Sequence, residues 1–218
     1  MKKVNLFASL FLGIAILFSG CGASNTTKGT AVGAGIGALL DGGKGAAWGA
    51  GIGAIVGGAA GALIGKKMDN QKKELEMIKD AQVETVNDGE AIKVTFDSGI
   101  LFAVNSSTLN QTSRNALTQF ANTLKTYPDT DVQIFGHTDS SGNDNINIPL
   151  SKDRAGSVQT FLRGQGIENS RMVAEGLGSS QPVADNSTTA GRTLNRRVEI
   201  FILPNAKMIQ EAQAGTLK

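Results

Sequence analysis

The sequence predicts an α+β sandwich in residues 88–204, preceded by a helical hairpin and a helical spacer. Two observations predict this fold class. Short apolar or alternating runs typical of strands take turns with amphipathic helical stretches, in the order β-α-β-α-β-β. A segment of this length is also large enough to enclose one hydrophobic core. Before residue 88 the composition changes, first to glycine-rich and then to charged.

The first 20 residues have the layout of a secretory signal peptide. Lys2 and Lys3 precede an uncharged, mostly apolar run over residues 6–18. That run is too short to span a membrane comfortably, which favours a cleaved signal over a membrane helix. Ser19-Gly20-Cys21 follows and resembles a bacterial lipobox. The resemblance implies a lipid on Cys21 and a tether over residues 21–28; an ordinary signal peptide with an incidental cysteine is the alternative.

Cys21 is the single cysteine of the chain, so no intramolecular disulfide can form. A lipidated cysteine fits an oxidising compartment better than a free thiol does. Gly22 occupies the position where an Asp favours the inner membrane in enterobacterial lipoproteins. The resemblance therefore implies a lipid anchor in the cell outer membrane, with the chain facing the periplasm.

The charge balance argues against nucleic acid as a partner. The chain carries 21 Lys and Arg against 19 Asp and Glu. Lys2 and Lys3 leave with the predicted signal peptide, so the remaining chain has 19 of each sign and no basic excess.

Residues 29–66 are predicted to form a glycine-zipper helical hairpin. Half of the 28 glycines fall between Gly29 and Gly65, most of them at a four-residue spacing. In a helix that spacing places them on one bare ridge, which lets two helices approach closely. Asp41 to Lys44 reads as the turn. The stretch resembles the glycine-zipper segment of some outer-membrane lipoproteins.

The second arm, Gly45–Gly65, is uncharged and roughly 31 Å long as a helix, enough to cross a bilayer core, with Lys66 and Lys67 at its end. A flexible Gly/Ala linker, a self-packed hairpin and a homo-oligomeric zipper stay open as alternatives. The next stretch, residues 67–87, is charged and is predicted to be a solvated helical spacer. After residue 204, residues 205–218 are expected to form a C-terminal tail.

The predicted elements of the domain follow from periodicity and turn signals. Alternation predicts a strand at 91–96, which 100–102 continues or pairs beside. Apolar spacing at i, i+3, i+4 and i+7 predicts a helix ending before Pro128, and a second helix stops at Gly164 or Gly166. The further strands are expected at 132–135, 172–174 and 198–201.

Several motifs in this order resemble the OmpA-like, peptidoglycan-associated domain, over most of residues 90–203. They are Leu101-Phe102-Ala103-Val104-Asn105-Ser106, Gly136-His137-Thr138-Asp139, Asn147 to Ala155, Gly176-Leu177-Gly178, Gly191-Arg192 and Asn195-Arg196-Arg197-Val198-Glu199-Ile200. Family members bind the stem peptide of peptidoglycan. The resemblance implies the same fold order and the same partner.

The resemblance also implies a set of ligand-binding residues. Asp139 matches the family aspartate that receives the ammonium of diaminopimelate. Arg154 matches the family arginine that holds the neighbouring carboxylate of the same ligand. A guanidinium suits a carboxylate because it presents a planar pair of donors. The remaining expected pocket residues are Asn105, Asn147, Thr138 and, at the rim, Arg196.

Bland structural roles compete with this interpretation. Asp139 could cap a turn, and Arg154 could pair with Asp153 or Asp144. His137, the single histidine, is expected to be a packed, hydrogen-bonded structural residue and not a base, and Arg197 and Glu199 are expected to share a strand face. Pro149 departs from the family pattern. Because proline removes an N–H and disfavours helix at Ile148, the helix is expected to start at Leu150, with Ser151 near its cap.

The sequence favours a non-enzymatic, lipid-anchored tether between membrane and peptidoglycan. A Cys–His pair, a two-His metal site and a phosphate-binding loop between strand and helix are all missing, so no cofactor or metal is expected. One rival hypothesis makes the glycine zipper a self-assembling membrane element with the domain as wall anchor. Another is an envelope assembly scaffold, in which the charged spacer contacts a second protein.

Overall fold

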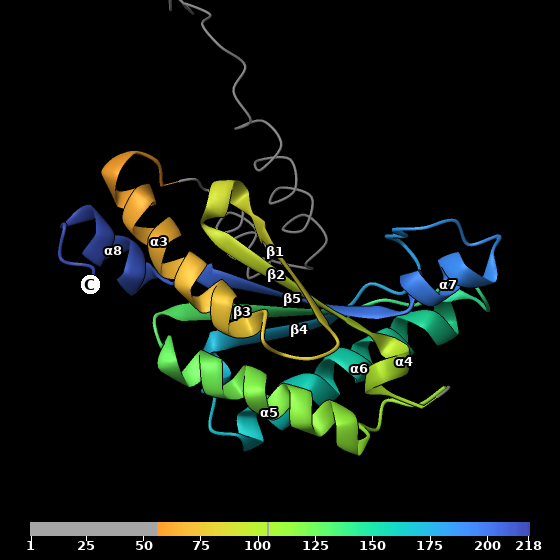
Figure 1. Cartoon of the computed structure of the whole chain (residues 1–218). Helices are drawn as coiled ribbons and strands as arrows, with labels where there is room; N and C mark the ends of the chain where they lie inside the picture. The colour runs from red at the N-terminus through yellow and green to blue at the C-terminus, as the bar shows by residue number, and fades with distance from the viewer. Residues whose placement is uncertain (1–55, 104) are drawn as a thin grey trace, which may run out of the picture.

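The computed structural model describes residues 56–103 and 105–218 (Figure 1). The predicted signal peptide, Cys21, the tether and most of the glycine zipper lie outside the described residues. The elements in chain order are α3 (Gly58–Leu75), β1 (Ala81–Val86), β2 (Ala91–Asp97), α4 (Ser98–Leu101), α5 (Gln111–Thr126), β3 (Thr130–Gly136), α6 (Asp144–Gly164), β4 (Met172–Gly176), α7 (Thr189–Asn195), β5 (Arg197–Pro204) and α8 (Ala206–Gln213).

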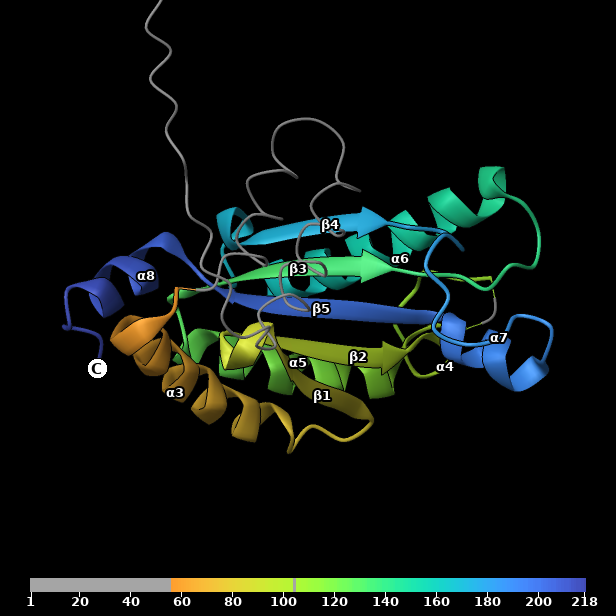
Figure 2. The same cartoon turned by 90° about the horizontal axis from the view of Figure 1, so that it is seen from above.

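The five strands form one sheet in the order β1-β2-β5-β3-β4 (Figure 2). β3 and β4 are parallel, and the other neighbouring pairs are antiparallel. Apart from the short helices α4 and α7, which the prediction did not include, the series β2-α5-β3-α6-β4-β5 reproduces the predicted β-α-β-α-β-β order. The predicted α+β fold class is confirmed, with β1 and α3 added before it and α8 after it.

The main core lies between the sheet and the helices α3, α5 and α6. In Figure 2 α5 and α6 lie behind the sheet and α3 runs along its β1 edge. Strand residues at every second position, such as Ile200, meet the apolar stripe of α5, which includes Leu117 and Phe120. Phe96 packs edge-on against Phe120, with 6.3 Å between ring centroids. Val158 of α6, the helix that carries part of the candidate site, belongs to the same core.

The prediction of a solvated helical spacer over residues 67–87 is wrong in two respects. α3 continues without a break from Gly58 through Lys66 and Lys67 to Leu75, so these lysines do not end a helix. Residues 81–86 form strand β1, paired antiparallel with β2. The sequence Ala-Gln-Val-Glu-Thr-Val alternates with period two, and an Asn-Asp-Gly turn with positive φ at all three residues closes the hairpin.

The end of the glycine ridge is packed against the domain. The buried carboxylate of Glu90 accepts hydrogen bonds from the backbone N–H groups of Val56 (2.9 Å) and Gly57 (3.2 Å). A Cβ at Gly61 would lie 2.6 Å from the Glu90 Oε1, so a larger residue there would displace this carboxylate from its bonds. Ile64 is fully buried in the main core. Residues 56–65 therefore belong to the domain, which contradicts a bilayer crossing by Gly45–Gly65.

Among the helices of residues 56–103 and 105–218, none is both long enough and apolar enough to cross a membrane.

Three further local predictions differ from the structure. Residues 98–101 form the short helix α4, and Phe102 makes only an isolated bridge to Leu109. The predicted tail contains α8, which buries Met208 against α3. Helix α6 starts at Asp144 and not at Leu150, with Pro149 inside it. The helix has already formed ahead of the proline, with Asn147 N bonded to Asn143 O (2.9 Å), and Pro149 removes the one N–H that would donate to the carbonyl of Asn145.

Candidate functional site

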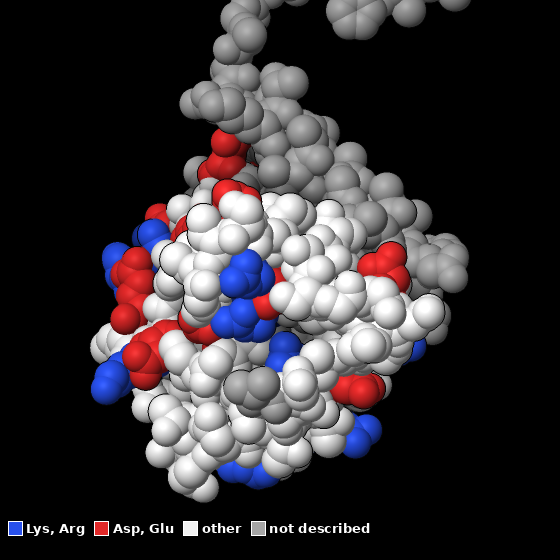
Figure 3. Space-filling model, turned by 90° about the vertical axis from the view of Figure 1, so that its right-hand side faces the viewer, with Lys and Arg blue, Asp and Glu red and all other residues white. Residues whose placement is uncertain are grey.

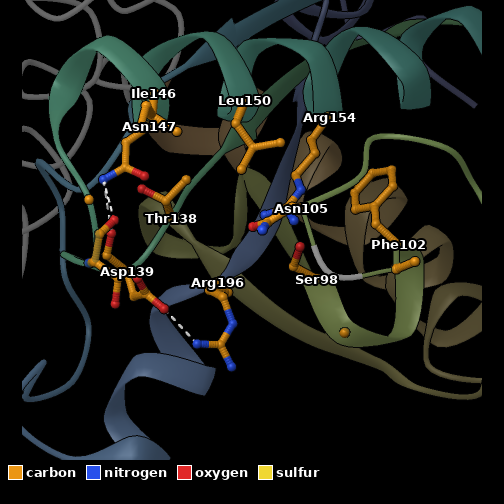
Figure 4. A pocket seen from close by; sticks show the side chains of 14 residues that line it. Ser98, Phe102, Asn105, Thr138, Asp139, Ile146, Asn147, Leu150, Arg154 and Arg196 are labelled. Atoms are coloured by element: carbon orange, nitrogen blue, oxygen red, sulfur yellow. Dashed lines mark hydrogen bonds and ion pairs between the residues drawn. The ribbon is translucent and has the colours of Figure 1, made fainter.

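A cavity of about 570 Å³ opens at the end of the sheet where α4 and α7 lie. All six residues that the sequence singles out for ligand binding line it together: Asn105, Thr138, Asp139, Asn147, Arg154 and Arg196 (Figure 4). They come from two loops, helix α6 and the junction between α7 and β5.

The strand order explains why residues far apart in sequence meet here. β5 lies between β2 and β3 and runs antiparallel to both, so its start meets their ends. The backbone N–H of Ser98 donates to the carbonyl of Arg196 (2.9 Å), and that of His137 donates to the carbonyl of Arg197 (2.9 Å). Asp139 follows His137 by two residues and so reaches the side chain of Arg196.

Two glycines let α6 approach the sheet closely enough to place Arg154 in the cavity. A Cβ at Gly136, the last residue of β3, would lie 2.0 Å from the carbonyl oxygen of Ser151. A Cβ at Gly176, the last residue of β4, would lie 2.3 Å from the backbone N of Lys152. Both atoms are backbone, so neither can swing away. These glycines of the sequence motifs are therefore required for packing and act on the site indirectly.

Arg154 is buried but has no ionic partner within the described part of the chain. Its side chain is held by a hydrogen bond from Nε to the carbonyl of Ser106 (3.1 Å), and its Cζ lies 5.4 Å from the centre of the Phe102 ring. None of the ion pairs among these residues includes Arg154. Pairing with Asp153 or Asp144 is therefore not seen. Burial, with the nearby charge of Arg196, lowers the Arg154 pKa, although it remains a cation at neutral pH.

Asp139 has both of its oxygens engaged. Oδ2 accepts from Arg196 Nη1 at 2.5 Å, and Oδ1 accepts from the backbone N–H of Ser141 at 2.8 Å. The turn-capping role that competes with ligand binding is therefore present, alongside a second role as the ionic partner of Arg196. Burial acts to raise the Asp139 pKa, but the hydrogen bonds from Arg196 and Ser141 outweigh it and hold that pKa below its usual value. The carboxylate is ionised at neutral pH.

The two asparagines differ in role. Asn147 is buried, and its Nδ2 donates to the carbonyls of Ser141 (3.0 Å) and Asp139 (3.4 Å), so it ties the Asp139 loop to α6. Asn105 is exposed at the cavity mouth with φ 53°, a left-handed conformation that asparagine tolerates better than most residues. Asn147 thus positions the loop, whereas Asn105 is available to a ligand.

Two buried hydroxyls in the cavity wall have no hydrogen-bond partner among the described residues. These are Thr138 Oγ1 and Ser98 Oγ, on residues that are 5% and 2% exposed. A buried hydroxyl without a partner is costly, so the wall is suited to a polar ligand. Thr138 was expected from the sequence. Ser98 was missed, since a serine after a strand carries no distinctive signal.

His137 lies beside the cavity but is not part of its lining. It is fully buried, and its Nε2 lies 3.5 Å from Glu199 Oε2, an electrostatic contact too long for a well-formed hydrogen bond. Burial lowers its pKa and keeps the ring neutral. Arg197 Nε and Glu199 Oε1 are 2.9 Å apart, so the predicted shared strand face is found. The packing expected for His137 is found, but the expected hydrogen bonding is not, because neither ring nitrogen has a hydrogen-bond partner among the described residues.

The charges at the cavity end of the molecule suit a ligand that carries an anionic group and a cationic group close together. Figure 3 shows that this end is mostly uncharged, with basic side chains gathered near its centre. Arg154 can receive a carboxylate, and Asp139 can receive an ammonium at its remaining lone pairs. Within the described residues there is no group of three or more His, Cys, Asp or Glu side chains that could hold a metal ion. Arg154 and Asp139 together can hold a zwitterion through its two opposite charges.

Comparison with known proteins gives the family. Residues 101–196 match the OmpA family, and residues 1–69 match the YMGG-like Gly-zipper. The probable lipoprotein YiaD of Escherichia coli is 38% identical over 217 residues, covering 93% of this chain and 99% of YiaD. The chain belongs to the OmpA family. The predicted combination of an OmpA-like domain, a lipoprotein and a glycine zipper is confirmed.

Two further relatives match the OmpA-like domain. Outer-membrane lipoprotein YfiB of Pseudomonas aeruginosa is 44% identical over 105 residues, 48% of this chain and 62% of YfiB. Peptidoglycan-binding protein ArfA of Mycobacterium tuberculosis is 39% identical over 112 residues, 51% of this chain and 34% of ArfA. The match spans less than two thirds of either relative.

Solved structures show the same fold. The cell wall anchor of the T6SS from Pseudomonas aeruginosa superposes with a TM-score of 0.55 at 27% identity, covering 63% of this chain and 97% of that one. A MotB-like protein from Desulfovibrio vulgaris gives a TM-score of 0.59 at 23% identity, over 67% and 96% of the two chains. The second comparison supports the α+β fold of the OmpA-like domain alone.

Proposed function

We propose that this protein is a lipid-anchored tether that binds peptidoglycan without covalent chemistry, through the diaminopimelate head group of the stem peptide. The observation that carries the proposal is the buried guanidinium of Arg154, which has no ionic partner among the described residues and shares a cavity with the ionised Asp139. A buried, unpaired charge is unfavourable unless a ligand compensates it.

The ligand chemistry follows from the two charges. The free end of diaminopimelate carries an ammonium and a carboxylate on one carbon. Its carboxylate pairs with the planar fork of Arg154, and its ammonium approaches the free lone pairs of Asp139 beside Arg196. The hydroxyls of Thr138 and Ser98 complete the contacts by bonding to the polar ends of the ligand.

The relatives support a role at the cell wall. ArfA is named a peptidoglycan-binding protein, and the superposed T6SS component is described as a cell wall anchor. YfiB is named an outer-membrane lipoprotein, which supports an outer-membrane location facing the periplasm with the lipid on Cys21. The proposed organisation keeps the signal peptide at 1–20 and the tether at 21–28. The wall-binding unit begins earlier than expected, because it includes α3 and β1.

A single site of this size gives modest affinity. Useful retention comes from many copies attached to one membrane, each of which meets the wall at a high effective concentration. The tether and the membrane anchor therefore matter for the function as much as the affinity of the cavity does.

A pull-down on purified sacculi tests this proposal. The full chain with Cys21→Ser is compared with the same chain carrying Asp139→Ala or Arg154→Ala. Asp153→Ala and Arg163→Ala serve as controls, because both residues are exposed and lie on the same helix as Arg154. We expect the two cavity variants to lose most of their retention and the controls to keep it. Equal retention of all five proteins would refute the proposed site.

A further inference from the structure

A second hollow lies next to the cavity, on the side of the helices that faces away from the sheet. It is a groove of about 890 Å³ between the loop before α5, the start of α5 and the exposed face of α6. Figure 1 shows these two helices packed together below the sheet. Among the described residues, none lines both this helix groove and the cavity. The helix groove is lined by residues that include Ser107, Arg114, Gly156, Ser157, Thr160 and Phe161.

Only a thin wall separates the helix groove from the cavity. On the cavity side, the carbonyl of Ser106 accepts the hydrogen bond from Arg154 Nε (3.1 Å). The next residue of the loop, Ser107, lines the helix groove, and so does Lys152, two residues before Arg154 on α6. A polymer with one branch in the cavity can therefore continue over this wall into the helix groove.

Hydroxyl groups in the helix groove are available to a ligand. The side chains of Ser157 and Thr160 line it from α6 and make no hydrogen bond within the described part of the chain. On α5, by contrast, Thr118 and Thr126 donate to carbonyls of their own helix, at 2.7 and 3.2 Å. The two α6 hydroxyls can each donate one hydrogen bond and accept others.

A guanidinium adds further donors at the α5 side of the helix groove. Arg114 Cζ lies 5.7 Å from the centre of the half-buried Phe161 ring, and its Nε makes one long hydrogen bond to the carbonyl of Leu109 (3.4 Å). No ion pair among the described residues includes Arg114. Its remaining N–H groups can therefore donate to carbonyl or hydroxyl oxygens of a ligand.

We propose that the helix groove binds the glycan strand of peptidoglycan, a polymer of N-acetylated amino sugars. The sugar hydroxyls and acetamide oxygens match the donors of Arg114, Ser157 and Thr160. Gly156 leaves room for a ring, since nothing lies within 4 Å of a Cβ built there. The lining of α6 from Lys152 to Gln165 extends over roughly 20 Å, which suits an extended chain.

The charges of the helix groove fit a neutral polymer. Arg114 and Lys152 are opposed by Asp153, so no strong field of one sign develops. Asp153 has no N–H or O–H to donate when ionised, so Asp153→Ala should leave the proposed sugar contacts intact.

This inference rests on the proposed function, because it takes the wall polymer as the ligand of the cavity. It adds a second contact on the same polymer. Once the stem peptide is held in the cavity, the glycan strand meets the helix groove at a high effective concentration, so even a weak second contact increases retention.

Calorimetric titration of the full chain carrying Cys21→Ser tests the inference, with peptide-free glycan strands and soluble stem peptide as separate ligands. Gly156→Trp fills the helix groove, and the exposed Arg163→Trp on the same helix is its control. We expect Gly156→Trp to bind glycan strands at least ~10-fold more weakly and to keep its affinity for the stem peptide. Arg154→Ala should show the reverse pattern, and Arg163→Trp should bind both ligands normally.

The two ligands separate failure of this inference from failure of the proposed function. A chain that binds stem peptide but not glycan strands, or equal glycan affinity in Gly156→Trp and Arg163→Trp, would overturn the helix groove as a sugar site. Binding of glycan strands without stem peptide would support it and contradict the proposed function alone.

If Gly156→Trp loses both ligands, the smaller change Arg114→Ala decides, with Arg163→Ala as its control. Weaker glycan binding with unchanged stem-peptide binding in Arg114→Ala supports the site, and equal glycan binding in the two alanine variants contradicts it.

Discussion

Asp139 and Arg154 line the same cavity, yet only Asp139 has an ionic partner in the described part of the chain. That partner is Arg196, at 2.5 Å. The cavity therefore presents an anion that is already held in place and a cation that is not compensated. In the binding mode that we propose, a ligand carboxylate pairs with Arg154, whereas a ligand ammonium shares Asp139 with Arg196. Replacements of Arg154 and Arg196 should accordingly have different consequences.

Removing Arg196 should change the pH dependence of binding more than its strength at neutral pH. Burial raises the Asp139 pKa, and Arg196 is one of the two residues whose hydrogen bonds lower it. In Arg196→Ala the pKa of Asp139 should rise, because burial then acts against one fewer hydrogen bond to the carboxylate. Because the ammonium needs an ionised Asp139, binding is lost as the pH falls through this pKa, and that loss should occur at higher pH in the variant.

Two measurements check the predicted shift in pH dependence. They are sacculus binding from pH 3 to pH 7 and carboxyl NMR titration of Asp139. At pH 7 retention should fall by about threefold or less, since the Arg196 side chain is 38% exposed and surface ion pairs contribute little. An unchanged acid limit of binding in Arg196→Ala would refute the role given to this pair.

Arg171 should matter for stability and not for binding. Its guanidinium donates to the carbonyls of Thr130 (2.8 Å), Tyr127 (3.0 Å) and Leu124 (3.2 Å), tying α5 to β3. Lysine cannot reproduce this fork, so Arg171→Lys should lower the free energy of unfolding by about 2 kcal/mol. Urea denaturation measures the loss, and the exposed Arg163→Lys is the control. A stable Arg171→Lys that fails to bind sacculi would contradict this separation of roles.

Two glycine replacements near α6 should have opposite effects. In Gly176→Ala the new Cβ would lie 2.3 Å from the backbone N of Lys152, so α6 must move and the protein should lose more than about 2 kcal/mol. Gly156 lies inside α6 with nothing within 4 Å of a Cβ, so Gly156→Ala should stabilise by about 0.5–1 kcal/mol. Thermal unfolding compares them. Equal midpoints in both variants would show that α6 does not depend on this close approach.

The buried pair of Glu199 and Arg197 should make stability depend on acid pH. Burial acts to raise the Glu199 pKa, but His137 and Arg197 outweigh it and lower the value to about 2. A carboxyl with a lowered folded pKa stabilises the protein above its ordinary value near 4.5, and this contribution is lost as the pH falls from there toward about 2. The stability difference between the unmodified chain and Glu199→Gln should therefore shrink over that window. Unfolding curves from pH 2 to pH 7 measure it, and a constant difference would exclude this linkage.

The domain was predictable from the sequence where local pattern and tertiary packing agree. The apolar spacing around Phe120 and the alternation before Phe96 lead to the same core in the structure. The motif glycines were recognisable, although the reason for them, the approach of α6 to Gly136 and Gly176, becomes visible only in three dimensions.

The flanking elements were predicted less well because tertiary contacts decide them. Strand β1 was assigned to a helix because Leu75 and Ile78 form a helical stripe just before it, and its alternating pattern becomes decisive only when β2 is there to pair with it. Likewise, no spacing in the sequence shows that Asp139 pairs with Arg196 and leaves Arg154 without a carboxylate. Such pairings depend on rotamers and strand register.

The proposed function requires the cavity to recognise an ammonium and a carboxylate on one carbon. The most direct test is calorimetric titration of the full chain with two soluble stem peptides, one with diaminopimelate and one with lysine, which lacks the second carboxylate. We expect at least ~10-fold tighter binding of the diaminopimelate peptide, and loss of that preference in Arg154→Lys, since one charge-assisted pair contributes roughly 1.5–3 kcal/mol. Equal affinity for the two peptides in the unmodified chain would contradict it.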